Sequence, residues 1–258
     1  MPHDPLYGPG PARVARSAKT WLGGLLHLLL PAPCLGCGEP LLASAPLGLC
    51  APCRGKLAPL GRTACAVCAG PLDAFDPPPG YCCGACREEP PAFDRLLALW
   101  VYRPPLDAVV QGLKFRRLDY LGRHLANALA DGLGEALDGF DGVVPVPLHW
   151  RRRFTRGYNQ AERIACPLAG RLGLPLVPVL RRSRPTPPQT SLGKAGRLAN
   201  LRRAFRVPRP EKIRGLRLLL VDDVATTGAT LDAAAGVLRR AGAAGVTAVV
   251  AARTPAFR

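Results

Sequence analysis

The sequence lacks several patterns that would assign it to a common class of protein. It contains neither a G-x-x-x-x-G-K-[ST] loop nor a Rossmann G-x-G-x-x-G fingerprint, which argues against P-loop and dinucleotide-binding proteins. No apolar run reaches the length of about 18 residues that a transmembrane helix needs. The longest such stretch, Trp21–Pro31, is followed by no small-residue cleavage site, which argues against a signal peptide. We interpret it as an amphipathic helix that packs on the neighbouring domain, with membrane-surface contact as the weaker alternative, and we predict a cytoplasmic protein.

Acidic residues are also scarce. The 258 residues include 18 Asp and Glu but 35 Lys and Arg, which gives a formal net charge of +17. The excess is concentrated between Arg151 and Arg217, where 18 Lys and Arg accompany only Glu162 and Glu211. Such a density favours polyanionic partners, namely nucleic acid, substrates that carry pyrophosphate, or an acidic membrane surface. The alternative is a basic surface that serves only solubility.

Nine of the ten cysteines lie close together in the sequence and include four C-x-x-C pairs. The pairs are Cys34/Cys37, Cys50/Cys53, Cys65/Cys68 and Cys83/Cys86. Two such pairs supply the four thiolates of a closed tetrahedral Zn²⁺ site, so the sequence predicts two zinc ions that are structural rather than catalytic. A disulfide framework is the alternative, but a cytoplasmic location disfavours it. Cys82 and Cys166 are left over and are expected to be ordinary small residues.

The cysteine region contains an internal repeat. The segment 34–41, CLGCGEPL, matches 65–72, CAVCAGPL, and the segment 50–54, CAPCR, matches 83–87, CGACR. One unit therefore consists of a C-x-x-C knuckle, a hairpin and a second knuckle, and it occurs twice. The simplest pairing is sequential, with each unit binding its own zinc, although an interleaved pairing remains possible. Each unit is too small for a hydrophobic core, so metal binding would supply its folding energy.

A second informative stretch is 218–231, LLLVDDVATTGATL. Four apolar residues are typical of a strand buried on both faces, and a helix-like run follows the small residues. We expect Asp222 and Asp223 where the strand ends, at the sheet edge where open α/β folds bind ligands. Backbone N–H groups and hydroxyls of the turn 225–230 could hold a phosphate, and the two carboxylates suit a sugar diol or a hydrated Mg²⁺. The pattern favours a receptor for a phosphorylated ribose.

This stretch resembles the loop that binds phosphoribosyl pyrophosphate (PRPP) in type I phosphoribosyltransferases. The resemblance implies that Asp222 and Asp223 hold the ribose hydroxyls, directly or through Mg²⁺, as the catalytic carboxylates. It further implies that the 5′-phosphate is held by Ala225, Thr226, Thr227, Gly228, Ala229 and Thr230. Enzymes of this class that act on 6-oxopurines carry an acidic residue where this chain has Thr226, so the resemblance supplies no general acid or base.

Strands and helices alternate over the rest of the chain, which predicts a parallel α/β sheet. The expected strands are 95–102, 142–146, 174–180, a short one near Phe205, 218–221 and 246–252. The expected helices are 104–115, 120–137, 159–172 and 231–241. We therefore expect a basic N-terminal segment over 1–30, disordered and then apolar, a double zinc ribbon over 31–91, and an α/β domain like that of type I phosphoribosyltransferases over 92–258.

Taken together, the segments resemble the ComF family (ComFC or GntX-like) from about Leu30 to Arg253. The motifs that carry the resemblance are GLKF at 112–115, PVPL at 145–148, RGYNQ at 156–160, PQTSL at 188–192, RLAN at 197–200 and the stretch 220–230. By the same similarity, the pyrophosphate-binding loop is Pro145, Val146, Pro147 and Leu148. The basic segment 184–197 occupies the place of the mobile loop that closes over PRPP, with Lys194 or Arg197 neutralising the leaving pyrophosphate.

The family is associated with natural competence, which implies single-stranded DNA and competence DNA-translocation proteins as partners. Arg151, Arg152, Arg153 and Arg156 are the candidate DNA contacts, with neighbouring aromatic side chains for base stacking. Three functions stay open at this point. The chain could be a PRPP-binding competence factor, an active phosphoribosyltransferase of nucleotide metabolism, or a PRPP-sensing regulator without turnover.

Overall fold

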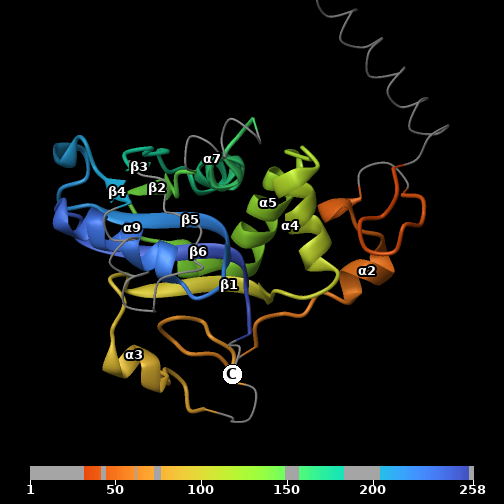
Figure 1. Cartoon of the computed structure of the whole chain (residues 1–258), viewed down its shortest axis with the longest axis horizontal. Coiled ribbons are helices and arrows are strands. Elements are labelled where there is room, and N and C mark those ends of the chain that lie inside the picture. Colours follow the sequence, from red (N-terminus) through yellow and green to blue (C-terminus); the bar gives the residue numbers. More distant parts are fainter. Residues whose placement is uncertain are drawn as a thin grey trace, which may run out of the picture.

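Figure 1 shows the computed structural model of the chain. The structure describes residues 32–41, 45–61, 63–72, 77–148, 157–182 and 204–255. The N-terminal segment 1–30, with the apolar stretch Trp21–Pro31, lies outside these residues. Within the described residues, no helix combines the length and the apolar composition needed to cross a membrane.

The centre of the molecule is a four-stranded sheet, and all its strand pairs are parallel. The strand order is β1 (Arg95–Val101), β6 (Gly245–Arg253), β5 (Arg217–Ala225) and β2 (Gly142–Pro145). Every residue of β6 is buried, as expected for a central parallel strand whose two faces are both covered. The predicted parallel α/β sheet is therefore confirmed.

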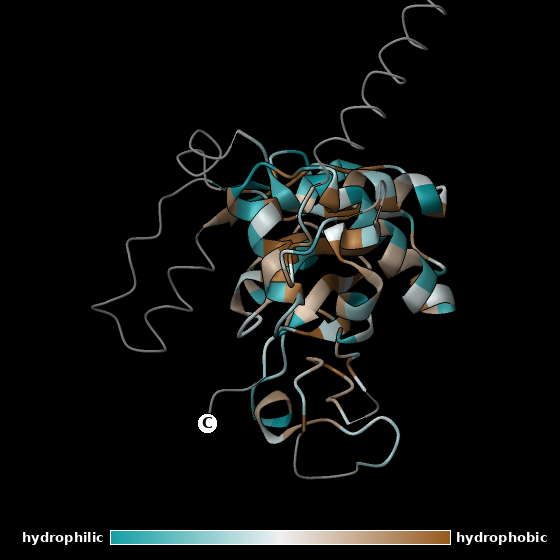
Figure 2. Ribbon diagram, turned by 90° about the vertical axis from the view of Figure 1, so that its right-hand side faces the viewer, coloured by the Kyte–Doolittle hydropathy of each residue, from teal (hydrophilic) through white to brown (hydrophobic). Residues whose placement is uncertain are grey.

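Two hydrophobic layers cover the sheet. On one face, α9 (Ala229–Arg240) packs its apolar residues against alternate residues of β5 such as Leu218 and Leu220. On the other face, Leu219 and Val221 share a cluster with α4 (Leu106–Phe115), α5 (Leu121–Leu133) and α7 (Gln160–Leu172). Both hydrophilic and hydrophobic residues occur along the helices in Figure 2. Each helix thus buries one stripe and exposes another.

The remaining elements are short. They are η1 (Pro46–Gly48), α2 (Ala51–Gly55), α3 (Gly84–Glu88), η2 (Gly134–Leu137), η3 (Pro210–Lys212), and the antiparallel pair β3 (Arg181–Arg182) and β4 (Phe205–Arg206). Figure 1 shows α2 beside α4 and α5, whereas α3 lies below β1. The two cysteine-rich halves therefore contact different parts of the α/β domain.

Three expectations from the sequence need correction. The helix expected over 120–137 ends at Leu133, because Gly134 takes a φ of +47°, and the separate 3₁₀ helix η2 follows. The segment 174–180 is not a regular strand, because within it only Leu176 pairs with β2, through one bridge to Val143. Pro175 and Pro178 have no backbone N–H to donate to a ladder, which explains the difference. The strand expected over 218–221 continues to Ala225, so Asp222 and Asp223 lie inside β5 rather than after it.

Candidate functional site

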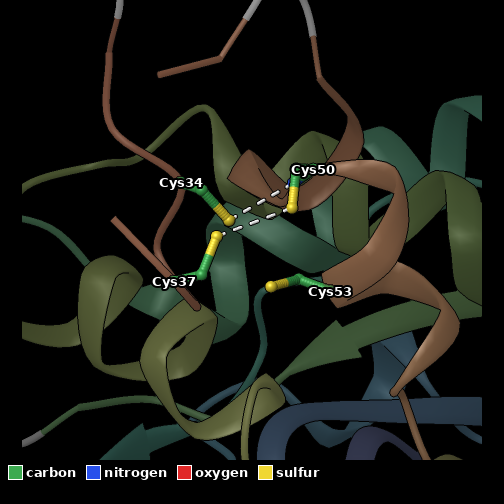
Figure 3. Close-up of side chains that lie close together, drawn as sticks. All are labelled: Cys34, Cys37, Cys50 and Cys53. Carbon is green, nitrogen blue, oxygen red and sulfur yellow. Dashed lines mark hydrogen bonds between the residues drawn. The ribbon is translucent and has the colours of Figure 1, made fainter. Parts of the chain in front are cut away.

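The eight paired cysteines gather in two groups of four. Cys34, Cys37, Cys50 and Cys53 form one group, and Cys65, Cys68, Cys83 and Cys86 form the other. Within each group the four sulfur atoms all lie within 4.8 Å of one another, and Figure 3 shows the first group converging on a common centre. This is the sequential pairing, not the interleaved one.

The spacing of the sulfur atoms fits zinc. A tetrahedral site with Zn–S bonds of about 2.3 Å places neighbouring sulfurs roughly 3.8 Å apart. The Sγ atoms of Cys37 and Cys50 are 3.7 Å apart, and those of Cys68 and Cys83 are 3.9 Å apart. The two Cys₄ clusters therefore support two structural zinc ions. We call residues 32–55 the first zinc module and residues 63–88 the second zinc module.

The thiol ionisation also fits a divalent cation. Burial opposes ionisation of Cys34, but the backbone N–H groups of Cys50, Cys37 and Gly36 outweigh it and lower the pKa of Cys34 to about 6. Burial and the neighbouring thiols instead raise the pKa of Cys53. Without a cation, only part of such a cluster can ionise. A bound Zn²⁺ would hold all four sulfurs as thiolates.

The second module shows the same pattern. Backbone N–H groups outweigh burial and lower the pKa of Cys65 to about 6, whereas burial raises the pKa of Cys86. The N–H of Cys83 donates to Cys65 Sγ over 3.3 Å, which reproduces the 3.3 Å bond from Cys50 N–H to Cys34 Sγ. The sequence repeat is therefore a repeat of structure.

The carboxylates of β5 lie near the carboxyl end of the sheet. Pro145, the last residue of β2, pairs with Val221, so Asp222 and Asp223 extend beyond the end of β2, while β5 stays paired with β6 on its other side. Asp223 is buried, with 4% of its surface exposed, and Asp222 is half-buried. Each carboxylate accepts the N–H of the next residue, over 2.9 Å for Asp222 and 2.8 Å for Asp223.

Lys114 of α4 completes this acidic pair, and sequence reasoning missed it. Its Nζ lies 3.0 Å from Asp223 Oδ2. The residue belongs to the GLKF motif, which carried the family resemblance, but nothing in the sequence places that motif beside β5. The ammonium group neutralises one of two adjacent carboxylates, so the site has one cation against two acids.

Among the described residues, no basic side chain lies within ion-pair distance of the second carboxylate, Asp222. Burial and the negative charge of Asp223 raise the pKa of Asp222 to about 7. Lys114 and Arg182 act in the opposite direction but do not restore the ordinary value. At neutral pH a carboxyl group with this pKa is only partly ionised, and a cation or a hydrogen-bond donor bound beside it would favour the ionised form.

The turn after β5 has the form of a phosphate cradle. Thr226 and Thr227 are exposed, and Gly228 takes a left-handed conformation with φ of +82° at the start of α9. A Cβ atom at Gly228 would meet nothing within 4 Å, so the space beside this N-cap residue is open. Thr227 Oγ1 accepts the N–H of Ala229 over 3.3 Å. A helix N-terminus with neighbouring hydroxyls suits an anion.

The segment after β2 lies beside the same edge. Val146 is buried and donates its N–H to the carbonyl of Val221 over 2.9 Å. Asn159 caps α7 by accepting the N–H of Ala161, and its Nδ2 donates to the carbonyl of Val146 over 3.0 Å. This bond gives Asn159, the asparagine of the RGYNQ motif, a structural purpose, because it fixes the segment that follows β2 relative to α7. The residues Pro145 to Leu148 thus stand next to the acidic pair.

Several residues predicted from the sequence cannot be placed. Lys194 and Arg197 of the predicted mobile loop lie outside the described residues. The same holds for the predicted DNA contacts Arg151, Arg152, Arg153 and Arg156. Of the remaining cysteines, Cys166 is exposed, and the thiol of Cys82 donates to the adjacent carbonyl of Cys83.

Two family models match the chain. A double zinc ribbon domain matches residues 25–87, and a phosphoribosyl transferase domain matches residues 159–257. The second match contains β5, the turn 226–230 and α9. The two matches agree with the two Cys₄ clusters and with the parallel sheet.

Proteins of known name match most of the chain. The DNA utilization protein YhgH of Salmonella typhi is 35% identical over 225 residues, which cover 85% of this chain and 96% of that protein. Competence protein F of Haemophilus influenzae is 31% identical over 210 residues, which cover 75% of this chain and 91% of that protein. Among solved structures, the glutamine PRPP amidotransferase from B. subtilis complexed with ADP and GMP is 23% identical with a TM-score of 0.37. That likeness, over 50% of this chain and 25% of the other, carries no further argument.

Proposed function

Because the chain belongs to the ComF family, with the DNA utilization protein YhgH and competence protein F as its homologues, we propose that it binds PRPP and acts on or with single-stranded DNA. The observation that carries the PRPP proposal is the arrangement at the end of β5. Two adjacent carboxylates are followed, within one turn, by the N-terminus of α9, with open space beside its N-cap Gly228. Few ligands other than a phosphorylated sugar need both groups so close together.

In this proposal, each segment holds one part of PRPP. Asp222 and Asp223 hold the ribose hydroxyls or a Mg²⁺ ion, for which their donor atoms are suited. The turn from Ala225 to Thr230 holds the 5′-phosphate, and the segment from Pro145 to Leu148 lies where the pyrophosphate would bind. Bound Mg²⁺ would neutralise charge on the pyrophosphate, and Lys194 or Arg197 would close over it.

Catalysis in such a site would depend on positioning and charge. Displacement of pyrophosphate from the ribose C1 needs no protein nucleophile, so the residues above would act by orienting PRPP and neutralising the leaving group. The same residues would serve an active phosphoribosyltransferase of nucleotide metabolism or a PRPP sensor without turnover. We propose a cytoplasmic site of action, because PRPP and reduced zinc-binding thiols both occur there.

Calorimetric titration of Mg²⁺·PRPP into the zinc-loaded protein tests this proposal. The variant Asp222→Asn with Asp223→Asn should weaken binding by about 100-fold or more, because Mg²⁺ prefers carboxylate ligands. Asp138→Asn removes an exposed carboxylate away from the site and should bind like the wild type. Retained affinity in the double variant, with an unchanged far-ultraviolet spectrum, would refute the site.

A separate observation favours single-stranded nucleic acid as a partner. The exposed large hydrophobic residues of the described part are Phe115, with 67% of its surface exposed, and Tyr120, with 46%. Phe115 is the last residue of α4, and Tyr120 is the N-cap of α5. We call residues 115–120 the basic-aromatic turn, in which the exposed Arg116 and Arg117 lie between the two rings. Bases stack on exposed aromatic rings while arginines contact phosphates, and this combination tolerates any sequence. The turn begins next to Lys114, so a bound strand would pass close to the acidic pair.

Fluorescence anisotropy of a labelled deoxythymidine oligonucleotide tests this partner. Stacking contributes about 1–3 kcal/mol per base, so the loss of both rings in Phe115→Ala with Tyr120→Ala should weaken binding by about 30-fold or more, with little change in salt dependence. Arg116→Ala with Arg117→Ala should reduce the slope of log affinity against log salt by about 1.4, since each phosphate contact on a single strand contributes about 0.7. The control, Arg209→Ala with Lys212→Ala, removes the same charge near η3. If the control loses as much affinity for the oligonucleotide as the two test variants, the basic-aromatic turn is not a specific binding site, and this proposal fails.

A further inference from the structure

A buried arginine connects the second zinc module to the proposed phosphate loop. Arg253 is the last residue of β6, and only 7% of its surface is exposed. Its Nε donates to the carbonyl of Cys68 over 3.0 Å, and its Nη1 donates to the carbonyl of Ala225 over 3.1 Å. One rigid guanidinium group thus bridges a zinc-ligand residue and the residue that precedes Thr226.

The next residue strengthens the connection at the loop. Thr254 donates its N–H to the carbonyl of Ala225 over 3.0 Å, and its Oγ1 donates to the carbonyl of Thr226 over 3.1 Å. With the bond from Arg253, three hydrogen bonds fix the first two residues of the turn. The end of β6 therefore sets the direction in which the chain leaves β5 and enters the phosphate loop.

The charge of Arg253 points to the zinc cluster as its partner. A buried cation is costly unless an opposite charge compensates it. Among the described residues, no carboxylate lies within ion-pair distance of Arg253. A Cβ atom added to Gly70 would lie 3.3 Å from Cys68 Sγ and 4.0 Å from Arg253 Nη2, so the guanidinium and this sulfur flank the same glycine. A Zn²⁺ ion with four thiolates carries a formal charge of about −2, which can compensate Arg253.

The first zinc module has no equivalent connection in the described part of the chain. Cys37, which corresponds to Cys68 in the repeat, is exposed. The first module instead contacts the helices, for example where His124 Nδ1 accepts the N–H of Leu47 over 2.9 Å. In the described part of the chain, the second zinc module is therefore connected to the phosphate loop through Arg253, and the first is not.

We propose that Arg253 is a positioning residue through which zinc in the second module, and not in the first, holds the phosphate loop in its binding conformation. Its effect on affinity rests on the proposed PRPP function, but its effect on the loop does not. Loss of zinc from the second module frees the turn that contains Cys68 and leaves the charge of Arg253 uncompensated. The loop then exchanges its backbone hydrogens faster and binds the 5′-phosphate more weakly.

Hydrogen exchange of the peptide that covers 224–230 tests the loop without any ligand. Arg253→Met leaves all eight cysteines intact and should increase exchange there by about 10-fold, as expected when buried hydrogen bonds that fix a local structure are lost. Arg253→Lys, which keeps the charge but cannot bridge both carbonyls, should give a smaller increase. Leu125→Ala, a truncation in the opposite hydrophobic layer, should lower the melting temperature without a selective change in this peptide.

The equivalent cysteine variants separate the two modules. Cys86→Ser should increase exchange over 224–230, whereas Cys53→Ser should leave it unchanged and affect residues near α4 and α5. Metal analysis should find about two zinc ions per chain in Arg253→Met and about one in each cysteine variant. When the same variants are titrated with Mg²⁺·PRPP, Arg253→Met and Cys86→Ser should each bind it about 10-fold more weakly than the wild type.

Two results would overturn the inference. One is unchanged exchange over 224–230 in both Arg253→Met and Cys86→Ser. The other is an equal increase in Cys53→Ser and Cys86→Ser, which would reflect general destabilisation. If the wild type binds no PRPP but the selective increase in exchange is observed, the proposed function fails while the zinc-to-loop connection stands.

Discussion

The two zinc modules have the same internal geometry but different surroundings. In each, a backbone N–H of the second knuckle donates to the first thiol over 3.3 Å, and four sulfurs converge. Leu47 and Leu49 of the first module belong to the hydrophobic cluster of α4, α5 and α7. In the second module, Val67 accepts the N–H of Leu96 at the edge of β1, and Cys68 accepts a hydrogen bond from Arg253. The two copies of the repeated unit therefore contact different parts of the domain, one the helical layer and the other β1 and the end of β6.

Removal of one zinc ligand from each module should give the largest difference between them. Cys53→Ser should lower the free energy of unfolding by about 3 kcal/mol or more, because a metal-held unit inside a main hydrophobic cluster is lost. Cys86→Ser should cost clearly less in global stability, since its module lies at the sheet edge. Differential scanning calorimetry, with zinc content measured on the same samples, checks this order. A larger loss in Cys86→Ser would contradict this order.

Truncation of one apolar side chain in each module gives a smaller test that leaves the metal in place. Leu49 is fully buried, so Leu49→Ala should cost about 2–5 kcal/mol. Val67 is only half-buried, and Val67→Ala should cost about 1 kcal/mol. Urea unfolding followed by circular dichroism measures both, and equal costs would show that the two modules are anchored equally.

An effect smaller than that of Leu49→Ala is expected at Asp222, which belongs to neither module. Its folded-state pKa of about 7 lies above the unfolded value of 3.8. Between these values the folded state binds more protons than the unfolded state, so stability falls as pH rises from about 4 to about 7. In Mg²⁺-free buffer at pH 8, Asp222→Asn should therefore stabilise the protein by about 1–3 kcal/mol, after allowance for partial exposure.

That gain should shrink as the pH is lowered towards 5, and thermal melts across this range would show it. A gain that does not depend on pH would mean that Asp222 keeps an ordinary pKa. Measurement of the two cysteine variants in the Asp222→Asn background removes this shared pH dependence and sharpens the comparison of the modules.

Local patterns in the sequence predicted a large part of this structure. The repeat offsets predicted which four cysteines converge, because each unit is complete within about twenty residues. The apolar run followed by small residues predicted β5, the turn and α9. These features depend on neighbours in the chain, which the sequence displays directly.

The features that sequence reasoning missed depend on contacts between distant residues. The ion pair from Lys114 to Asp223 and the bridge from Arg253 to Cys68 join segments that only the folded sheet brings together. Lys114 lay in a recognised motif and Arg253 ended an expected strand, yet neither position reveals its partner. The strand wrongly expected over 174–180 has a different origin. The apolar residues of this segment favoured a strand, but its two prolines cannot donate the backbone hydrogen bonds that a sheet needs.

Hydrogen exchange of the wild-type, zinc-loaded protein with and without Mg²⁺·PRPP tests the central claim most directly. The account predicts that PRPP slows exchange over Thr226 to Thr230 and leaves the first zinc module unchanged, because the phosphate binds at the N-terminus of α9. Unchanged exchange over Thr226 to Thr230 at saturating Mg²⁺·PRPP would contradict it.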